Sequence, residues 1–361
     1  MNNRLNIGVL LSLLMLGACG GGGGSGSGTI SAADDASETG DVADISDTDT
    51  EDSDGDESIE QGDDDTATGV STDGTTNGVL CDYEDVTYNN QESLTYTSES
   101  KWTCTETTRE LTANGIPDHD VGTFPNANNP NTITEQTVSA SYTLIPEASG
   151  IATELGGPRG TLGYVLNGVK IDAGTGGSCD DSGDNCSLGG GGGSWNIEAL
   201  GQTSFDFGTD ENNAHVQPGG AYHYHGMPEG FIAKRGGNSN AVTLIGWAAD
   251  GFPIYARYGH SIADDASSPL KVLSGSYQLV SKVPTNRPPV DVYPLGTFAQ
   301  DWVYDPESGD LDECNGRFGV TPEFPEGVYH YYATDTYPYF QRCVTGAVAA
   351  GNSNPGQPPT L

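Results

Sequence analysis

Residues 241–259 read "AVTLIGWAADGFPIYARYG", and this stretch decides the fold class. An apolar run is followed by Asp250 and Gly251, and then by a second apolar run that contains Pro253. Asp-Gly between two hydrophobic runs is a strong turn signal, so the stretch predicts a β-hairpin.

Short β-prone runs of the same kind recur along the chain, while helical periodicity is scarce. Gly, Pro, Asn and Asp separate the runs, as is typical of a β-rich protein with many turns. The sequence therefore predicts a mainly β fold, with a single β-rich domain with long loops over residues 80–346 and a flexible tail at 347–361. The other β-prone runs are 136–145, 161–171, 220–226, 274–280 and 327–334.

The N-terminal residues 1–19 have the features of an export signal. Arg4 precedes an apolar run over 7–16, which is too short to span a bilayer alone. The run ends in "LGAC" and resembles a bacterial lipoprotein signal, which implies that Cys19 is lipidated and becomes the mature N-terminus. Gly20 follows, which by the same resemblance implies sorting to the outer membrane or cell surface. An ordinary signal peptide is the alternative.

Residues 20–79 have a different composition. They begin with a Gly-rich run and contain 17 acidic residues and no Lys or Arg. Such a segment cannot bury enough apolar surface to offset its ordering entropy, so it predicts a disordered acidic tether that holds the domain away from the membrane. Residues 80–361 carry 12 basic and 34 acidic residues, a charge of −22. This charge argues against a nucleic-acid partner and is compatible with divalent cations.

Six of the seven cysteines remain once Cys19 is set aside, and an even number in an exported chain indicates disulfides. A zinc site is the alternative, but the chain has no Cys-x-x-Cys pair. Proximity in the sequence favours the pairs Cys81–Cys104, Cys179–Cys186 and Cys314–Cys343.

Residues 220–226 read "GAYHYHG" and contain two of the six histidines. In a strand, side chains alternate between faces, so His223 and His225 share one face and Tyr222 and Tyr224 the other. The two imidazoles then lie about 7 Å apart along the strand. With one or two more ligands they can hold zinc or copper.

Three further residues are candidate ligands for the same ion. His215 lies upstream of a Pro-Gly-Gly turn that can fold it back beside the strand. Met227 is the only methionine after the signal, and a thioether suits copper. His330, in "GVYHYYAT" (327–334), aligns with His223, so the two aromatic strands are expected to pair and to share one pocket.

His119 is a further candidate ligand, next to Asp118 and Asp120. These carboxylates, with Asp250, also allow a calcium site as a minor alternative. The competing interpretation of the whole set is structural: histidines hydrogen-bonded within an aromatic core, with Met227 filling a gap.

Four separated motifs resemble the YHYH domain family of mostly exported bacterial proteins, over about residues 80–346. They are "NGIPDHDVGTFPNANNPNTI", "GAYHYHGMPEG", "IGWAADGFPIYARYG" and "LDECNGRFGVTPEFPEGVYHYYATDTYPYFQRC". The resemblance implies no activity and no catalytic residues.

The expected function is therefore that of a lipid-anchored, extracytoplasmic metal-binding protein of the cell envelope. An enzyme built on such a site would be a metal-dependent oxidoreductase or hydrolase. The alternative function is a non-catalytic surface-binding or adhesion module.

Overall fold

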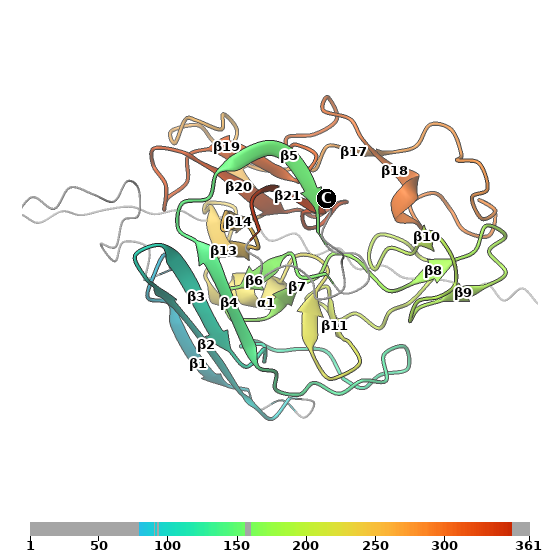
Figure 1. Cartoon of the computed structure of the whole chain (residues 1–361), viewed down its shortest axis with the longest axis horizontal. Helices are drawn as coiled ribbons and strands as arrows, with labels where there is room; N and C mark the ends of the chain where they lie inside the picture. Colours follow the sequence, from blue (N-terminus) through green and yellow to red (C-terminus); the bar gives the residue numbers. More distant parts are fainter. Residues whose placement is uncertain (1–78, 90, 92–93, 156–159, 349–361) are drawn as a thin grey trace, which may run out of the picture. The chain divides into compact units, whose positions relative to one another are not determined.

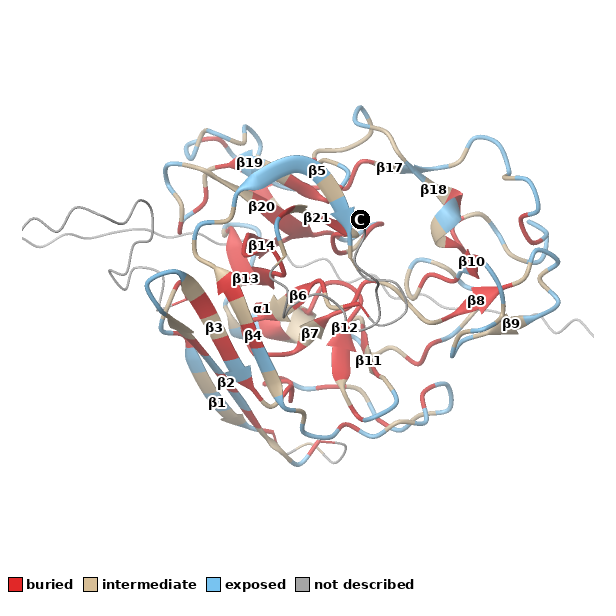
Figure 2. Cartoon of the chain, viewed as in Figure 1, coloured by how far each residue is buried: buried red, intermediate tan, exposed pale blue. Residues whose placement is uncertain are grey.

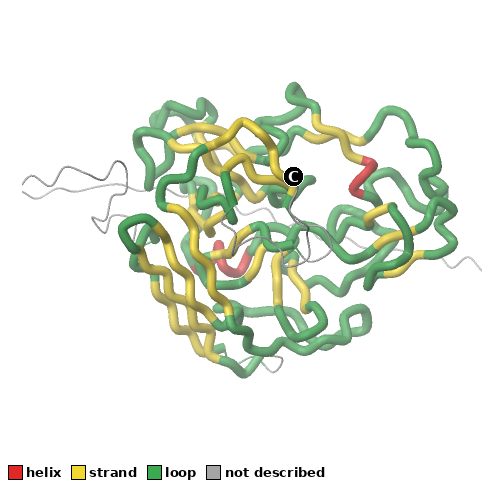
Figure 3. Tube along the Cα trace, viewed as in Figure 1, coloured by secondary structure: helices red, strands yellow, loops and turns green. Residues whose placement is uncertain are grey.

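The structure is a computed structural model that describes residues 79–89, 91, 94–155 and 160–348. The predicted signal with Cys19, the acidic segment and the end of the tail lie outside these residues. The described chain is mainly β, as the sequence predicts, and long loops join the strands (Figure 3). Its helices are α1 (Glu229–Lys234) and the 3₁₀ helix η1 (Ala299–Asp301). No helix in the described part is long and apolar enough to cross a membrane.

The largest sheet has eight strands (Figure 1). Adjacent strands in this sheet run antiparallel, except in two parallel pairs, β12 with β7 and β14 with β20. In spatial order the strands are β11 (Ala214–Val216), β12 (Tyr222–Tyr224), β7 (Lys170–Ile171), β6 (Gly163–Val165), β13 (Thr243–Ala248), β14 (Pro253–Ala256), β20 (Val328–Ala333) and β19 (Gly316–Gly319).

The predicted hairpin forms the middle of this sheet. Every residue of β13 and β14 is buried, which explains why both runs are apolar without alternation (Figure 2). Asp250 and Gly251 lie in the turn, where the Gly251 amide donates to the Ala248 carbonyl at 2.9 Å. The prediction of a hairpin at this position is confirmed.

A four-stranded sheet contacts the large sheet. Two of its buried side chains reach across: the Trp102 indole donates to the Leu166 carbonyl at 2.9 Å, and the Arg109 guanidinium lies 3.3 Å from the Trp247 ring centroid. Only the last strand of this sheet lies in one of the β-prone runs of the sequence. The second and third strands lack an apolar pattern, because they bury Ser98, Ser100 and Arg109 beside their apolar residues. The strands are β1 (Glu84–Tyr88), β2 (Thr97–Cys104), β3 (Thr108–Ala113) and β4 (Val138–Thr143).

The remaining strands form small sheets in the loops. They are β8 (Ser178–Cys179) with β9 (Cys186–Ser187) and β10 (Trp195–Asn196), β15 (Tyr258–His260) with β16 (Leu270–Val272), β17 (Tyr277–Leu279) with β18 (Trp302–Tyr304), and β21 (Cys343–Gly346) with β5 (Ala148–Glu154).

Three disulfides staple the fold, and all three predicted pairs are confirmed. Cys179 and Cys186 face each other across the β8–β9 pair. The other two are Cys81–Cys104 and Cys314–Cys343.

Substitution of Gly251 tests how closely the turn of the hairpin approaches the other sheet. Its φ is +93°, and a Cβ there would lie 2.6 Å from the Thr143 carbonyl oxygen of the other sheet. Gly236, with φ +72° and open space around its Cβ position, is the matched control. We expect Gly251→Ala to lower the free energy of unfolding by about 3 kcal/mol and Gly236→Ala by about 1 kcal/mol, because only the first adds a clash to backbone strain. Urea denaturation with the disulfides intact measures both values; equal losses would contradict the close approach of the turn to β4.

Candidate metal centre

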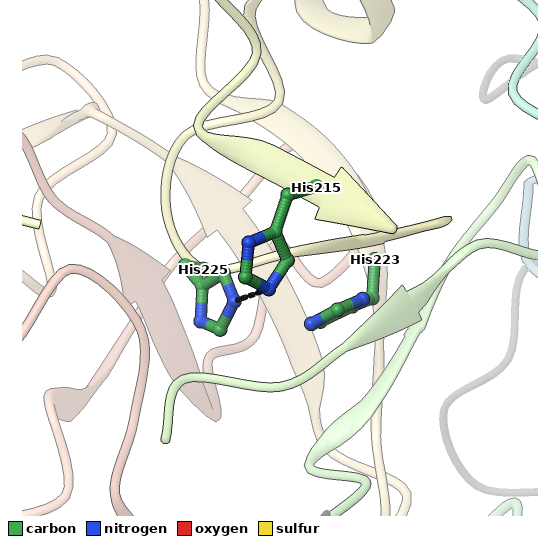
Figure 4. A group of neighbouring side chains, drawn as sticks. All are labelled: His215, His223 and His225. Carbon is green, nitrogen blue, oxygen red and sulfur yellow. Dashed lines mark hydrogen bonds between the residues drawn. The ribbon is translucent and has the colours of Figure 1, made fainter. Parts of the chain in front are cut away.

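Three histidines converge at the edge of the large sheet. The antiparallel pairing of β11 with β12 puts His215 directly opposite His223. His225 follows β12, and its amide donates to the Asn213 carbonyl at 2.8 Å, which continues the pairing. Strand alternation returns His225 to the face of His223. Figure 4 shows the three imidazoles turned toward one another from these two strands.

The spacing of the imidazoles is that of a candidate metal site. The ring centroids lie 4.7 Å apart in each of the three pairs. The Nε2 atoms of His215 and His225 are 3.1 Å apart, and one nitrogen from each ring lies within 4.8 Å of the others. Two imidazole nitrogens bound tetrahedrally to one zinc ion would be about 3.3 Å apart. The closest pair, His215 and His225, is therefore already near ligand spacing.

Backbone carbonyls orient two of the rings. His215 Nδ1 lies 2.8 Å from the Phe207 carbonyl oxygen, and His223 Nδ1 lies 3.2 Å from that of Ala221. A carbonyl only accepts hydrogen bonds, so each Nδ1 carries the proton and each Nε2 carries a lone pair. Metal-bound histidines in proteins are commonly held in this way.

Burial keeps these histidines neutral. His223 and His225 are 3% and 2% exposed, and burial is the main cause that lowers the pKa of both well below the ordinary value. The neighbouring imidazoles and Lys170 lower the two pKa values further. Burial also lowers the pKa of His215, which is partly exposed. All three are therefore in the unprotonated form that binds metal.

The tyrosines lie on the opposite face of β12, as alternation predicts, and His119 lies with them. His119 Nε2 is 2.6 Å from the Tyr224 hydroxyl, and the Tyr222 hydroxyl donates to Asp210 at 2.7 Å. Since β12 separates this face from the three histidines, the structure does not bring His119 into their group.

His330 also lies elsewhere, and the expected pairing of the two aromatic strands is wrong. Four strands separate β20 from β12, a path of about 24 Å along the sheet. His330 Nε2 lies 3.1 Å from the Tyr332 hydroxyl, and burial lowers the His330 pKa to about 4. Met227 is 2% exposed and belongs to the hydrophobic core.

The carboxylates considered for calcium do not form one site. Asp118 pairs with Lys234 at 2.8 Å, and Asp250 accepts from the Tyr331 hydroxyl at 2.6 Å. Among the described residues, the three histidines are the only group of His, Cys, Asp or Glu side chains whose ligand atoms converge.

A partly buried ion pair lies beside the histidines, and no motif of the sequence predicts it. Lys170 lies opposite His223 in the parallel β7–β12 pair, and its ammonium is 2.9 Å from Asp172 Oδ2. Their side chains are 14% and 5% exposed. Lys170 and Asp172 are two residues apart, so alternation gives them a common face where the strand continues past Ile171. The sequence does not reveal that β12 is the neighbouring strand.

The lowered histidine pKa values make metal-free stability pH-dependent. Below about pH 6.5 the unfolded chain protonates these histidines and the folded chain does not, so stability is lost as the pH falls. We expect each of His223 and His225 to contribute about 2 kcal/mol of this loss by pH 5. Urea denaturation in chelator at pH 7 and pH 5 measures it for the wild type and His223→Gln/His225→Gln. A double variant with an unchanged difference between the two pH values would contradict the burial of neutral imidazoles.

Comparison with known proteins shows that a family model matches the part of the chain that contains the three histidines. The model of the family described as YHYH protein matches residues 139–346, more than half of the chain. No curated protein and no solved structure matches the chain. The match starts in β4, later than the sequence motifs suggest, so β1 to β3 and His119 precede it. The chain belongs to the YHYH protein family.

Proposed function

We propose that this chain is a lipid-anchored, extracytoplasmic protein of the cell envelope that binds one zinc or copper ion through His215, His223 and His225. The convergence of these three imidazoles is the observation that carries the proposal. The burial and neutral state of the imidazoles support it. So do the carbonyls that hold Nδ1 of His215 and His223, because they leave the Nε2 lone pairs of these two rings available to an ion.

The donor set favours a transition metal over calcium or magnesium. Imidazole nitrogens suit zinc and copper, whereas calcium takes oxygen ligands. The spacing of the rings accepts either zinc or copper, and the metal content of the purified protein distinguishes them.

Three protein ligands leave a coordination position open. Zinc sites with three histidines and one water are typically catalytic, whereas structural sites use four protein ligands. The proposed centre therefore has the ligand count of a site that acts on a water molecule or on a small ligand. His215 is the most exposed of the three, so we expect such a ligand to reach the ion past His215.

The proposed anchor rests on the N-terminal sequence alone. Cys19 after a short apolar run supports lipidation, and the acidic, Lys- and Arg-free segment that follows supports a tether between membrane and domain.

Metal content tests the proposed centre. We expect the purified full chain to hold about one zinc or copper ion, because three neutral imidazoles converge on one point. His223→Ala/His225→Ala should lose that ion, while His260→Gln, which changes a histidine outside the group, should keep it. Elemental analysis after dialysis measures all three proteins, with circular dichroism to check folding. Equal metal in the double variant and the wild type would overturn the proposal.

Fractionation tests the anchor. We expect Cys19→Ser to move the protein from the membrane fraction to the soluble extracytoplasmic fraction, because the variant has no thiol for the lipid. Cys19 is the single cysteine outside the three disulfides, so the substitution leaves the fold intact. A variant that stays with the membrane, or a wild type without radiolabelled fatty acid, would contradict lipidation.

A further inference from the structure

Two buried polar atoms beside the metal centre have no hydrogen-bond partner. They are Nδ1 of His225 and Oδ1 of Asp172. An unpartnered buried polar atom costs about 1–3 kcal/mol, so such atoms need an explanation. Here one is a ring nitrogen that can carry a proton and the other is a carboxylate oxygen that can accept it.

The strand pairing places these two residues side by side. In the parallel β7–β12 pair, Lys170 lies opposite His223 and Ile171 opposite Tyr224. The Asp172 amide then donates to the Tyr224 carbonyl at 3.0 Å, which extends the pairing and puts Asp172 next to His225. Laterally neighbouring residues of paired strands share a face, with Cβ atoms about 5 Å apart. The carboxylate therefore lies on the histidine face.

Lys170 holds the other carboxylate oxygen. Its ammonium lies 2.9 Å from Asp172 Oδ2 and 3.4 Å from Gln217 Oε1, which leaves Oδ1 free. Burial raises the pKa of Asp172 to about 6, although Lys170 and Arg342 act to lower it. Arg342, which pairs with Glu198 at 2.8 Å, also adds to the lowering of the His225 pKa by burial.

The positions of the ring protons explain why Oδ1 of Asp172 and Nδ1 of His225 do not form a hydrogen bond with each other. His215 Nδ1 donates to Phe207, so His215 Nε2 is an acceptor, and the 3.1 Å contact requires the proton of His225 on Nε2. Nδ1 of His225 then carries a lone pair and cannot donate to the carboxylate. An ion on Nε2 of His225 takes the place of that proton, and the neutral ring carries its proton on Nδ1 instead.

We propose that Asp172 is a positioning residue of the metal centre, whose Oδ1 accepts a hydrogen bond from Nδ1–H of His225 when Nε2 of His225 binds the ion. This inference rests on the proposed function. The hydrogen bond to Asp172 sets the tautomer and the orientation of the His225 ring. It completes a series that runs from the Lys170 ammonium through the Asp172 carboxylate and the His225 imidazole to the ion. This series also places a negative charge between the Lys170 ammonium and the ion.

Zinc affinity tests the role of Asp172. We expect Asp172→Ala to weaken zinc binding by the full chain about 10–100-fold, the typical effect of losing such a partner. Asp172→Asn should lose less, because its amide oxygen still accepts a hydrogen bond. Asp250→Asn is the control: it changes another buried carboxyl with a raised pKa, which lies in the β13–β14 turn, and should leave the affinity unchanged. Competition with a chelating dye measures the affinities, and thermal unfolding confirms that each variant is folded.

Histidine ring NMR gives a second readout. In ¹⁵N-histidine-labelled wild type, we expect His225 to change from the Nε2–H to the Nδ1–H tautomer when zinc is added, with a downfield Nδ1 proton. That proton should move upfield in Asp172→Asn, in which the acceptor is uncharged, so the test does not depend on the folding of Asp172→Ala.

The outcomes separate the two proposals. A wild type that binds no zinc or copper would overturn the proposed function and this inference with it. Zinc binding with unchanged affinity in Asp172→Ala, or an unmoved His225 proton in Asp172→Asn, would overturn the inference alone.

Discussion

The group of three histidines depends on the register of three short strands, β11, β12 and β7. His223 on β12 lies opposite His215 on one neighbouring strand, β11, and opposite Lys170 on the other, β7. A shift of one residue between β11 and β12 would move His215 to the tyrosine face, because side chains alternate along a strand. The tight turn between these strands, closed by the Gly220 amide donating to the Gln217 carbonyl at 3.0 Å, fixes that register.

Burial then determines the chemistry that this register allows. His330 has nearly the same local sequence as His223 and is also buried, with its pKa lowered to about 4. Its Nδ1 contacts the Val328 carbonyl, and its Nε2 contacts the Tyr332 hydroxyl rather than a second imidazole. A neutral buried histidine is therefore not by itself a ligand. The two sites differ in what the neighbouring strand supplies: β11 carries His215, whereas β14 and β19 carry no histidine.

Local sequence patterns predict the features that depend only on residues close together in the chain. Alternation predicts the common face of His223 and His225, Asp250 and Gly251 predict the hairpin, and cysteine spacing predicts the disulfides. The pairing of strands far apart in the chain could not be predicted in this way. Similar local sequence therefore groups His330 with His223, and no local pattern connects Asp172 with His225, which follows it by more than 50 residues. The positions of His330 and Asp172 both depend on the spatial order of eight strands, which periodicity does not determine.

The disulfides have a consequence for how the chain acquires its fold. Each joins a cysteine to the next one in the sequence, with separations of 23, 7 and 29 residues, once Cys19 is set aside. If the chain is exported and Cys19 lipidated as proposed, an oxidant that acts on the chain as it emerges from the translocation pore would meet each native partner before any wrong one. Oxidation in order of appearance thus gives the native pairing directly, and reshuffling of mispaired cysteines, which is slow, is not needed. Maturation of this protein should therefore depend on a thiol oxidant and be insensitive to the loss of a disulfide isomerase.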